Sequence, residues 1–128
     1  MTMLRVLHVD DEPDIREVVE MSLALDPGLA LKSCASGLDA LALAADWLPN
    51  VILLDVMMPQ MDGPQTLRHL RSDDKTAEIL VLFMTARAQT HEVDHFLSLG
   101  ATGVISKPFD PMTLAGTVRN YLPGPPGI

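Results

Sequence analysis

Several kinds of residue are scarce in this chain of 128 residues. Aromatic residues make up only 4%, so any core must consist mainly of aliphatic side chains. The single cysteine, Cys34, cannot form an internal disulfide, which excludes a disulfide framework. Lys and Arg total 9 against 17 Asp and Glu, and a formal charge of −8 repels a phosphate backbone. We therefore expect no direct binding of nucleic acid.

Targeting and nucleotide-binding signals are also missing. No segment combines a charged start with the apolar stretch of a signal peptide, and none has the length of a membrane span. We therefore expect a cytoplasmic protein with no membrane contact. Neither Gly-x-Gly-x-x-Gly nor Gly-x-x-x-x-Gly-Lys occurs, which excludes dinucleotide and P-loop sites of the usual kind.

Hydrophobic residues are abundant, at 48% of the chain, and they form short apolar runs that alternate with longer stretches of helical spacing. The runs are nearly unbroken, as in parallel strands that helices cover on both faces. The five expected strands are Leu4–Val9, Leu29–Cys34, Val51–Leu54, Ile79–Met84 and Gly103–Ser106. This alternation predicts an α/β fold, a doubly wound parallel sheet of five strands flanked by five helices, for which we expect the flavodoxin-like order 2-1-3-4-5.

Local signals mark where the helices begin and end. The residues that carry these signals are Pro13, Ser36 with Asp39, Gly63-Pro64, Gly100 and Pro111. The first helix places Ile15, Val18, Val19 and Leu23 along one side. We expect a single domain over residues 1–122, and a Pro/Gly-rich tail or linker start over residues 123–128.

Polar residues follow four of the expected strands at their carboxyl ends, where an open α/β sheet binds its ligands. These residues are Asp10, Asp11, Asp55, Thr85 and Lys107. Two carboxylates about 4 Å apart repel by ~4 kcal/mol at an effective dielectric constant of about 20, so such a cluster requires a cation. Mg²⁺ is the natural one, because it takes one or two carboxylates and leaves positions for phosphate oxygens.

This constellation predicts a carboxylate nucleophile. Asp55 would form an aspartyl phosphate, and it needs no general base because an ionised carboxylate has no proton to lose. Lys107 would pair with Asp55 before the reaction and with a phosphoryl oxygen after it, while the Thr85 hydroxyl would donate to another oxygen. A solvated acidic rim would explain any one of these residues, but it explains poorly five of them at corresponding strand ends.

Four motifs at these strand ends resemble the receiver domains of two-component signalling, over residues 4–122. The motifs are His8-Val9-Asp10-Asp11-Glu12-Pro13, Asp55-Val56-Met57-Met58-Pro59-Gln60-Met61-Asp62-Gly63, Met84-Thr85-Ala86 and Ser106-Lys107-Pro108-Phe109. The resemblance implies that a sensor kinase or phosphotransfer protein passes a phosphoryl group from a phosphohistidine to Asp55. It further implies a switch in partner binding or dimerisation through the fourth helix, fifth strand and fifth helix.

The resemblance also assigns roles within the site. Asp11, Asp55 and the backbone carbonyl of Met57 would bind Mg²⁺ directly, and Asp10 would bind it through water. Thr85 and Lys107 would hold the phosphoryl oxygens. The small Ala86 would leave the pocket open, and Lys107-Pro108 would be a cis peptide.

One position departs from the family pattern. Many receivers have Tyr or Phe three residues before the lysine, where this chain has Val104. The inward swing of that aromatic side chain is therefore unavailable, and another group must carry the switch. The candidates are Phe83, Phe96, His91 and His95, although ordinary packing or surface positions account for each of them.

Two alternative functions remain to be weighed. A phosphatase with an aspartyl nucleophile needs a second acid two residues beyond it, where this chain has Met57. We therefore expect no enzyme beyond self-catalysed phosphoryl acceptance and autodephosphorylation. A degenerate receiver that binds partners without phosphorylation would be favoured if an acid, the threonine or the lysine were missing, and all are present.

The remaining histidines, methionines and cysteine have simpler interpretations. We expect His8 to pack in the first strand, and His69, His91 and His95 to lie on helix surfaces, since no third metal ligand accompanies the i, i+4 pair. Met57, Met58 and Met61 would pack over the site, and Cys34 would be a small buried side chain.

Overall fold

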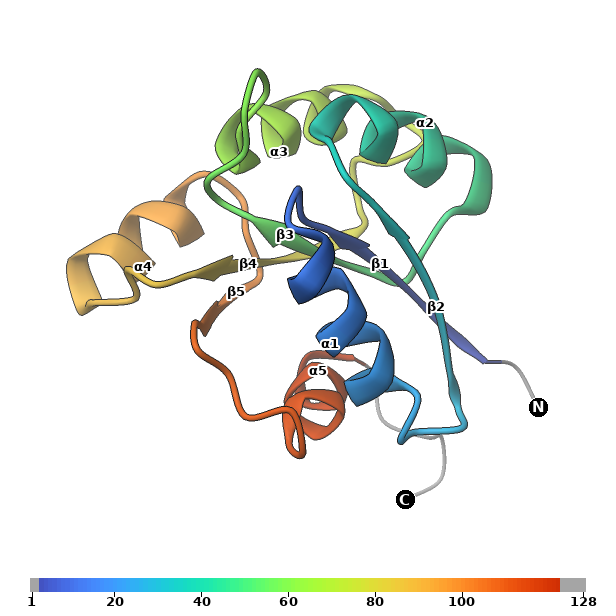
Figure 1. Ribbon diagram of the computed structural model, residues 1–128. Helices are drawn as coiled ribbons and strands as arrows, with labels where there is room; N and C mark the ends of the chain where they lie inside the picture. Colours follow the sequence, from blue (N-terminus) through green and yellow to red (C-terminus); the bar gives the residue numbers. More distant parts are fainter. Residues whose placement is uncertain (1–2, 123–128) are drawn as a thin grey trace, which may run out of the picture.

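The five parallel strands form one sheet in the order β2-β1-β3-β4-β5, as predicted (Figure 1). The computed structural model describes residues 3–122, so the expected tail at 123–128 lies outside the described residues. The strands are β1 (Leu4–Val9), β2 (Leu29–Cys34), β3 (Val51–Asp55), β4 (Leu80–Thr85) and β5 (Gly103–Ser106). Strand order reverses between β1 and β3, and this is the point where such a sheet binds ligands.

Helices cover both faces of this sheet (Figure 1). They are α1 (Pro13–Leu23), α2 (Gly37–Trp47), α3 (Gly63–Ser72), α4 (Thr90–Ser98) and α5 (Leu114–Tyr121). Helices α1 and α5 pack on one face, where Val19, Leu23, Leu114 and Val118 are fully or almost fully buried. The other face carries α2, α3 and α4.

The core is almost entirely aliphatic, as the scarcity of aromatic residues requires. All five residues of β3 are buried, which explains its unbroken apolar sequence before Asp55. Alternate residues of β3 contribute to different faces: Ile52 and Leu54 pack below α2 and α3, whereas Val51 and Leu53 pack against α1 and α5. Burial on both faces therefore secures the strand that ends in Asp55.

Side-chain caps determine where two helices begin. The Ser36 hydroxyl accepts a hydrogen bond from the Asp39 backbone N–H at 3.1 Å, as the sequence predicts for the start of α2. At the start of α3, Asp62 and Gln65 form a reciprocal capping box. The loop between Asp55 and α3 is therefore fixed at both ends.

The end of α4 also follows the prediction. Gly100 has a φ of 107°, a left-handed conformation that glycine adopts without steric cost. Its N–H donates to the Leu97 carbonyl and the Ala101 N–H donates to the Phe96 carbonyl, which together form a Schellman motif. This turn leads the chain directly into β5.

The predicted boundaries of β3, β4 and α5 were wrong. Strands β3 and β4 each extend one residue further, so Asp55 and Thr85 end their strands instead of following them, and β4 begins at Leu80. Helix α5 begins at Leu114, because Pro111 belongs to a turn that Asp110 stabilises by accepting the Met112 N–H. On α1, Val18 is 38% exposed although Val19 and Leu23 are buried, and the buried Ser22 donates its hydroxyl to the Pro111 carbonyl.

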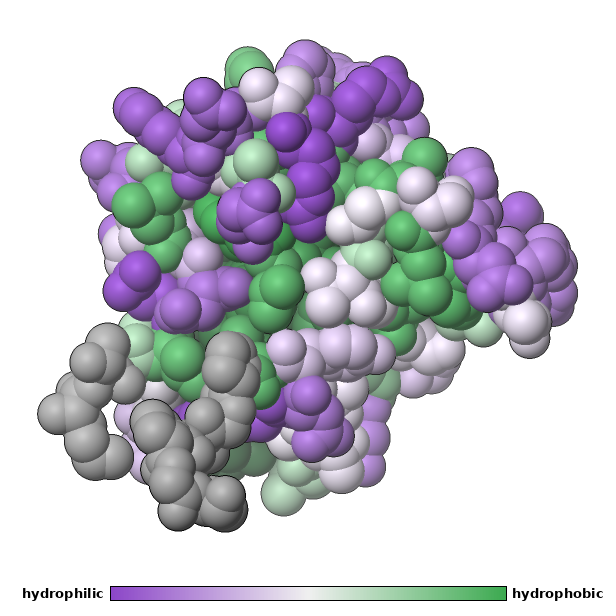
Figure 2. Space-filling view, turned by 180° about the vertical axis from the view of Figure 1, so that it is seen from behind, coloured by the Kyte–Doolittle hydropathy of each residue, from purple (hydrophilic) through white to green (hydrophobic). Residues whose placement is uncertain are grey.

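Seen from behind, apolar side chains lie between groups of polar ones on the surface (Figure 2). Among residues 3–122, no helix is both long enough and apolar enough to cross a membrane.

Candidate functional site

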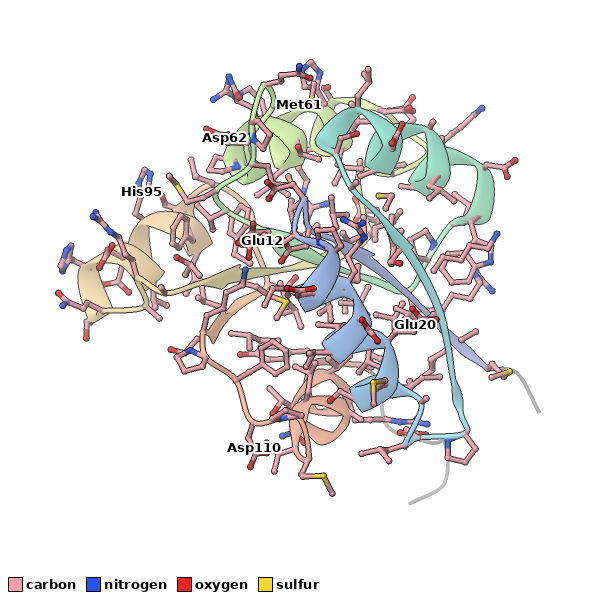
Figure 3. All side chains as sticks on the ribbon, in the orientation of Figure 1. Glu12, Glu20, Met61, Asp62, His95 and Asp110 are labelled. Carbon is pink, nitrogen blue, oxygen red and sulfur yellow. The ribbon has the colours of Figure 1, made fainter. Side chains whose placement is uncertain are left out.

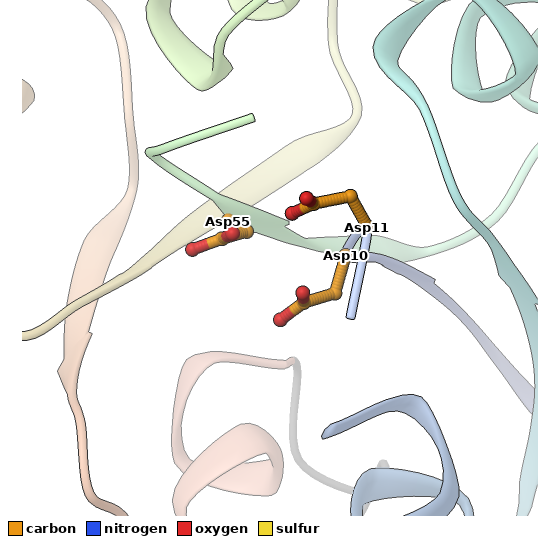
Figure 4. Close-up of side chains that lie close together, drawn as sticks. All are labelled: Asp10, Asp11 and Asp55. Atoms are coloured by element: carbon orange, nitrogen blue, oxygen red, sulfur yellow. The ribbon is translucent and has the colours of Figure 1, made fainter. Parts of the chain in front are cut away.

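Three carboxylates from the ends of β1 and β3 lie together at the carboxyl edge of the sheet (Figure 4). Asp10 and Asp11 follow β1, and Asp55 is the last residue of β3. One ligand atom from each lies within 4.8 Å of the others. Asp10 is fully buried and Asp55 is 5% exposed, so water screens the repulsion between them only weakly.

The backbone around Asp10 holds its carboxylate in place. The Asp10 N–H donates to the Cys34 carbonyl of β2 at 3.1 Å, which continues the sheet by one residue. The Glu12 N–H donates to Asp10 Oδ1 at 2.9 Å. The guanidinium of Arg16, one turn into α1, donates to the Asp10 backbone carbonyl at 2.7 Å. The sequence alone did not indicate this role of Arg16.

The chain after Asp55 turns back sharply towards α3. The Val56 N–H donates to the Met84 carbonyl of β4 at 3.2 Å, and the Gly63 N–H donates to the Val56 carbonyl at 2.9 Å. A Cβ atom on Gly63 would lie only 2.6 Å from the Asp55 carbonyl oxygen, closer than atoms can approach. Gly63 therefore permits the close return of the loop next to Asp55.

Lys107 joins the two buried acids. Its Nζ lies 2.9 Å from Asp55 Oδ1 and 3.1 Å from Asp10 Oδ2. The Lys107 N–H donates to the Thr85 carbonyl of β4 at 2.8 Å, and the peptide bond to Pro108 is cis, as the resemblance implied. The sheet ladder thus places the lysine opposite the carboxylates.

Burial and neighbouring charges have opposite effects on the pKa values of Asp55 and Lys107. Burial raises the pKa of Asp55, the hydrogen bond from Lys107 lowers it, and the neighbouring charge of Asp10 raises it again, with a net rise. Burial alone would lower the pKa of Lys107, but its hydrogen bond to Asp55 and the attraction of Asp10 raise it overall. The pocket therefore has more negative charge than one ammonium balances.

Thr85 lies beside this pair at the end of β4 and is 6% exposed. Its Oγ1 accepts the Arg87 backbone N–H at 3.0 Å. An oxygen that already accepts can still donate its own proton, so the hydroxyl can serve as a donor to a ligand oxygen.

A cleft of about 310 Å³ opens next to Thr85. Its walls come from the loop after β3, from the end of β4 and the loop that follows it, and from α4. The residues that line it are Val56, Met57, Thr85, Ala86, Arg87, Glu92 and Phe96. The cleft connects the candidate pocket with α4.

His8 occupies an unusual position below the acids. It lies in β1, is fully buried, and has no hydrogen-bond partner for either ring nitrogen within the described part of the chain. Its Nε2 is 4.0 Å from Asp10 Oδ2. Burial lowers the pKa of His8 from 6.5 to about 4, against the opposing effect of Asp10. The prediction that His8 packs in the strand agrees with this burial.

The predictions for the methionines and the cysteine agree only in part with the structure. Met58 is buried, but Met57 is 78% exposed, so its side chain does not pack over the site. Met57 nevertheless lines the cleft, as its position after Asp55 requires. Cys34 is only partly buried, and burial raises its pKa to about 11.

Of the other histidines, His69, His91 and His95 are exposed, as expected for helix surfaces. Of the two phenylalanines considered for the switch, Phe83 is fully buried and Phe96 is 8% exposed, and their ring centroids lie 5.0 Å apart. Val104 is partly buried against the same cluster.

The acidic residues suit a hard divalent cation. Three carboxylates offer oxygen ligands, which Mg²⁺ prefers, and they lie close enough together to share one ion. Asp11 is less buried than its two neighbours, which leaves the pocket accessible from solvent. A divalent ion would also compensate the charge that Lys107 leaves unbalanced.

A doubly wound sheet with this acidic pocket, threonine and lysine defines the class of receiver domains. A family model described as the response regulator receiver domain matches residues 6–119. The chain therefore belongs to the receiver domain family of response regulators in two-component signalling. Receiver domains of this family generally bind Mg²⁺ through an acidic pocket, and they interact with histidine kinases or phosphotransfer proteins.

Individual relatives agree with this assignment. Response regulator Rre1 of Synechocystis is 37% identical over 119 residues, which cover 93% of this chain and 52% of that protein. The solved chemotaxis response regulator CheY4 of Vibrio cholerae has a TM-score of 0.86 at 34% identity, covering 94% of this chain and 100% of that one. The BeF3-activated DrrB receiver domain has a TM-score of 0.79 at 26% identity, covering 94% and 97%. The chain spans about half the length of the curated relatives it matches.

Proposed function

We propose that Asp55 accepts a phosphoryl group from a phosphohistidine of a histidine kinase or phosphotransfer protein, with Mg²⁺ in the acidic pocket. The observation that carries the proposal is the shared contact of Lys107 with Asp55 and Asp10, at 2.9 and 3.1 Å. A mobile ammonium between two buried acids can follow negative charge from a carboxylate to a newly attached phosphoryl group.

In the proposed step, a carboxylate oxygen of Asp55 attacks phosphorus. The new P–O bond forms as the P–N bond to the donor imidazole breaks, and the bond pair leaves with the imidazole, which takes a proton from solvent. Lys107 and the Thr85 hydroxyl hold phosphoryl oxygens. Bound Mg²⁺ would supply positive charge to the transferring group, with Asp10, Asp11, Asp55 and the Met57 carbonyl around it.

A protein donor is supported by the surface next to Lys107. An apolar groove runs from Lys107 and Phe109 past Val18 to Met21 and Met112, between α1 and the segment before α5. Met21 is 67% exposed and Met112 is 75% exposed. Exposed apolar residues that lie together, unlike single ones, often mark a site of protein–protein interaction. The groove thus offers a docking surface continuous with the phosphoryl site.

The border of this groove indicates the chemistry of the donor surface. Glu12, Glu20 and Asp110 are exposed on the side that carries α1 and the segment before α5 (Figure 3). We therefore propose a donor with an apolar contact face and basic residues around it. The substitution Met21→Glu should slow transfer from a phosphorylated histidine phosphotransfer domain that is active on the wild type, but not modification by acetyl phosphate. Equal effects on both reactions would contradict this docking surface.

The proposed consequence of phosphorylation is altered partner binding or dimerisation through α4, β5 and α5. The cleft beside Thr85 supports this direction, since its wall includes Glu92 and Phe96 of α4. Movement of Thr85 towards a phosphoryl oxygen would change the packing of that wall. Under the same proposal, phosphorylation would also control binding to a downstream partner and the activity of any longer protein that contains this domain.

The experiment for Asp55 is incubation with acetyl phosphate and Mg²⁺, followed by intact mass measurement. The wild type should gain one phosphoryl group, and chelation of the metal should prevent it. The substitution Asp55→Asn should abolish the gain, whereas Asp14→Asn, at an exposed acid on α1, should leave it intact. Equal modification of the Asp55 variant would refute the assignment.

A phosphorylation-independent interaction module is the alternative function. It would be supported if the wild type gained no phosphoryl group under these conditions and still bound its partner. The presence of all three acids, Thr85 and Lys107 in one pocket favours the phosphorylated form.

A further inference from the structure

His8 is a fully buried polar side chain without a hydrogen bond inside residues 3–122. Leaving such a group unsatisfied is costly, and native structures rarely do so without a reason. Packing alone does not require an imidazole here, because most of the buried residues on this face of the sheet are aliphatic, although the partner of His8 in β2 is Ser33. The imidazole therefore requires an explanation other than packing.

The acid closest to the His8 ring is Asp10. His8 and Asp10 are two residues apart, so both side chains lie on the same side of the extended chain. Nε2 of His8 is 4.0 Å from Oδ2 of Asp10, about 1 Å more than an ordinary N–H···O hydrogen bond. The two groups face each other without bonding.

Two other groups already donate hydrogen bonds to the Asp10 carboxylate, one to each oxygen. Its Oδ1 accepts the Glu12 N–H at 2.9 Å, and its Oδ2 accepts the Lys107 ammonium at 3.1 Å. The Lys107 contact is the one that phosphorylation would remove, since the same ammonium also bonds to Asp55. A lysine drawn to a phosphoryl group would leave Oδ2 of a fully buried carboxylate without this donor.

We propose that His8 is a positioning residue that donates a hydrogen bond from Nε2 to Asp10 Oδ2 when Lys107 moves from Asp10 to the phosphoryl group on Asp55. This inference rests on the proposed function of Asp55. The neutral imidazole supplies one N–H and adds no charge to the pocket. In the unmodified protein no group of residues 3–122 bonds to the His8 ring, and in the phosphorylated protein His8 would keep Asp10 oriented towards the metal.

The direct test follows the imidazole itself. Wild-type protein labelled with ¹⁵N-histidine is studied by NMR with Mg²⁺ alone and with Mg²⁺ and beryllofluoride, which imitates a phosphoryl group. On addition of beryllofluoride, the Nε2 proton of His8 should move downfield and exchange more slowly with water. The signals of His69 and His91, which are exposed, serve as internal controls. An unchanged His8 signal in protein that has bound beryllofluoride overturns the inference.

Two substitutions test the functional consequence. His8→Leu fills the site but removes the donor, whereas the amide nitrogen of His8→Gln can take the place of Nε2. Loss of a hydrogen bond to a charged group predicts roughly tenfold weaker beryllofluoride binding for the leucine variant. The glutamine variant should regain most of that affinity, and both variants should bind Mg²⁺ alone like the wild type.

The outcomes separate this inference from the function on which it rests. Wild-type protein that binds no beryllofluoride, and gains no phosphoryl group on Asp55, overturns both. Normal binding by wild type and by both variants leaves phosphoryl acceptance in place and overturns the role of His8. Equal weakening in both variants means that His8 only packs, and also overturns it.

Discussion

The ammonium of Lys107 lies 2.9 Å from Oδ1 of Asp55, and the pair is largely shielded from solvent, with side chains 19% and 7% exposed. The same ammonium also contacts Asp10, so one positive charge serves two buried acids. Removing one partner of such a group leaves uncompensated charge in a medium that solvates it poorly. The folded protein should therefore lose stability when neither the Lys107 ammonium nor a metal ion balances the charges of Asp10 and Asp55.

Replacing Lys107 tests this balance. Lys107→Met should lower the free energy of unfolding by about 3 kcal/mol without metal, because Asp10 and Asp55 lose their counter-charge. Urea titration with and without Mg²⁺ measures the effect, and Mg²⁺ should restore part of the loss. Lys75→Met, at an exposed turn, is the control and should change stability by less than about 0.5 kcal/mol. Similar losses in the two variants would contradict the role of the pocket.

Binding of Mg²⁺ to the native pocket alone should raise the melting temperature of the wild type. Asp11→Asn should reduce this rise, because it removes one of three clustered oxygen donors. Differential scanning calorimetry across a range of Mg²⁺ concentrations measures the shift. Asp74→Asn, at an exposed acid outside the cluster, should retain the full rise. A rise that is the same in both variants would exclude Asp11 as a ligand.

Two glycine substitutions separate a steric requirement from helix propensity. Gly63→Ala places a methyl group 2.6 Å from the Asp55 carbonyl, so the loop must move and stability should fall by about 1–3 kcal/mol. Gly116→Ala, within α5, should instead stabilise by about 0.5–1 kcal/mol, because among residues 3–122 no atom beyond the adjacent residues and local helix backbone lies within 4 Å of the new methyl. Thermal unfolding measures both. The Gly63 variant should also gain less phosphoryl group from acetyl phosphate, and normal modification would show that the loop tolerates the shift.

Much of the fold could be predicted because the physical signals are local. Both faces of β3 are buried, so its sequence is continuously apolar, and Ser36 and Gly100 are suited to particular helix ends. The pocket followed from the topology, since the carboxyl ends of parallel strands meet at one edge. Asp10, Asp11 and Asp55 accordingly converge as predicted.

Other features depend on tertiary contacts that no local pattern contains. The exposure of Met57 reflects a loop that turns back through Gly63, and the later start of α5 reflects hydrogen bonds of Asp110. The contact of Arg16 with the Asp10 carbonyl depends on how α1 leaves the sheet. That His8 has no hydrogen-bond partner in the described part of the chain likewise becomes apparent only when its neighbours are placed.

The buried His8 should make stability depend on pH. Its pKa is lowered from 6.5 to about 4, so between these values the unfolded chain binds a proton that the native protein does not. The contribution of His8 to the free energy of unfolding is therefore fully present above pH 6.5. It is lost as the pH falls towards 4, by about 3 kcal/mol in total. Chemical unfolding of metal-free wild type and His8→Leu at several pH values isolates the effect. Parallel pH curves for the two proteins would contradict it.

Because Val104 stands where many receivers have an aromatic residue, other side chains must connect the site with α4. Phe96 of α4 lines the cleft beside Thr85 and packs against Phe83 at 5.0 Å between ring centroids. If Thr85 moves towards a bound phosphoryl oxygen, the wall formed by Phe96 loses contact, and amide exchange in Thr90–Ser98 should change.

Hydrogen–deuterium exchange with and without beryllofluoride in Mg²⁺ measures this coupling. Phe96→Leu retains an apolar side chain at a cost of about 1 kcal/mol, but it removes the ring that contacts Phe83, so the change in α4 should be much smaller. Leu97→Ala, at a neighbouring position that is 42% exposed, should leave the change intact. If beryllofluoride binds to the wild type without altering exchange in α4, the signal must leave the pocket by another route. A change of equal size in the Phe96 variant would place the coupling in the backbone after Thr85 instead of in the ring.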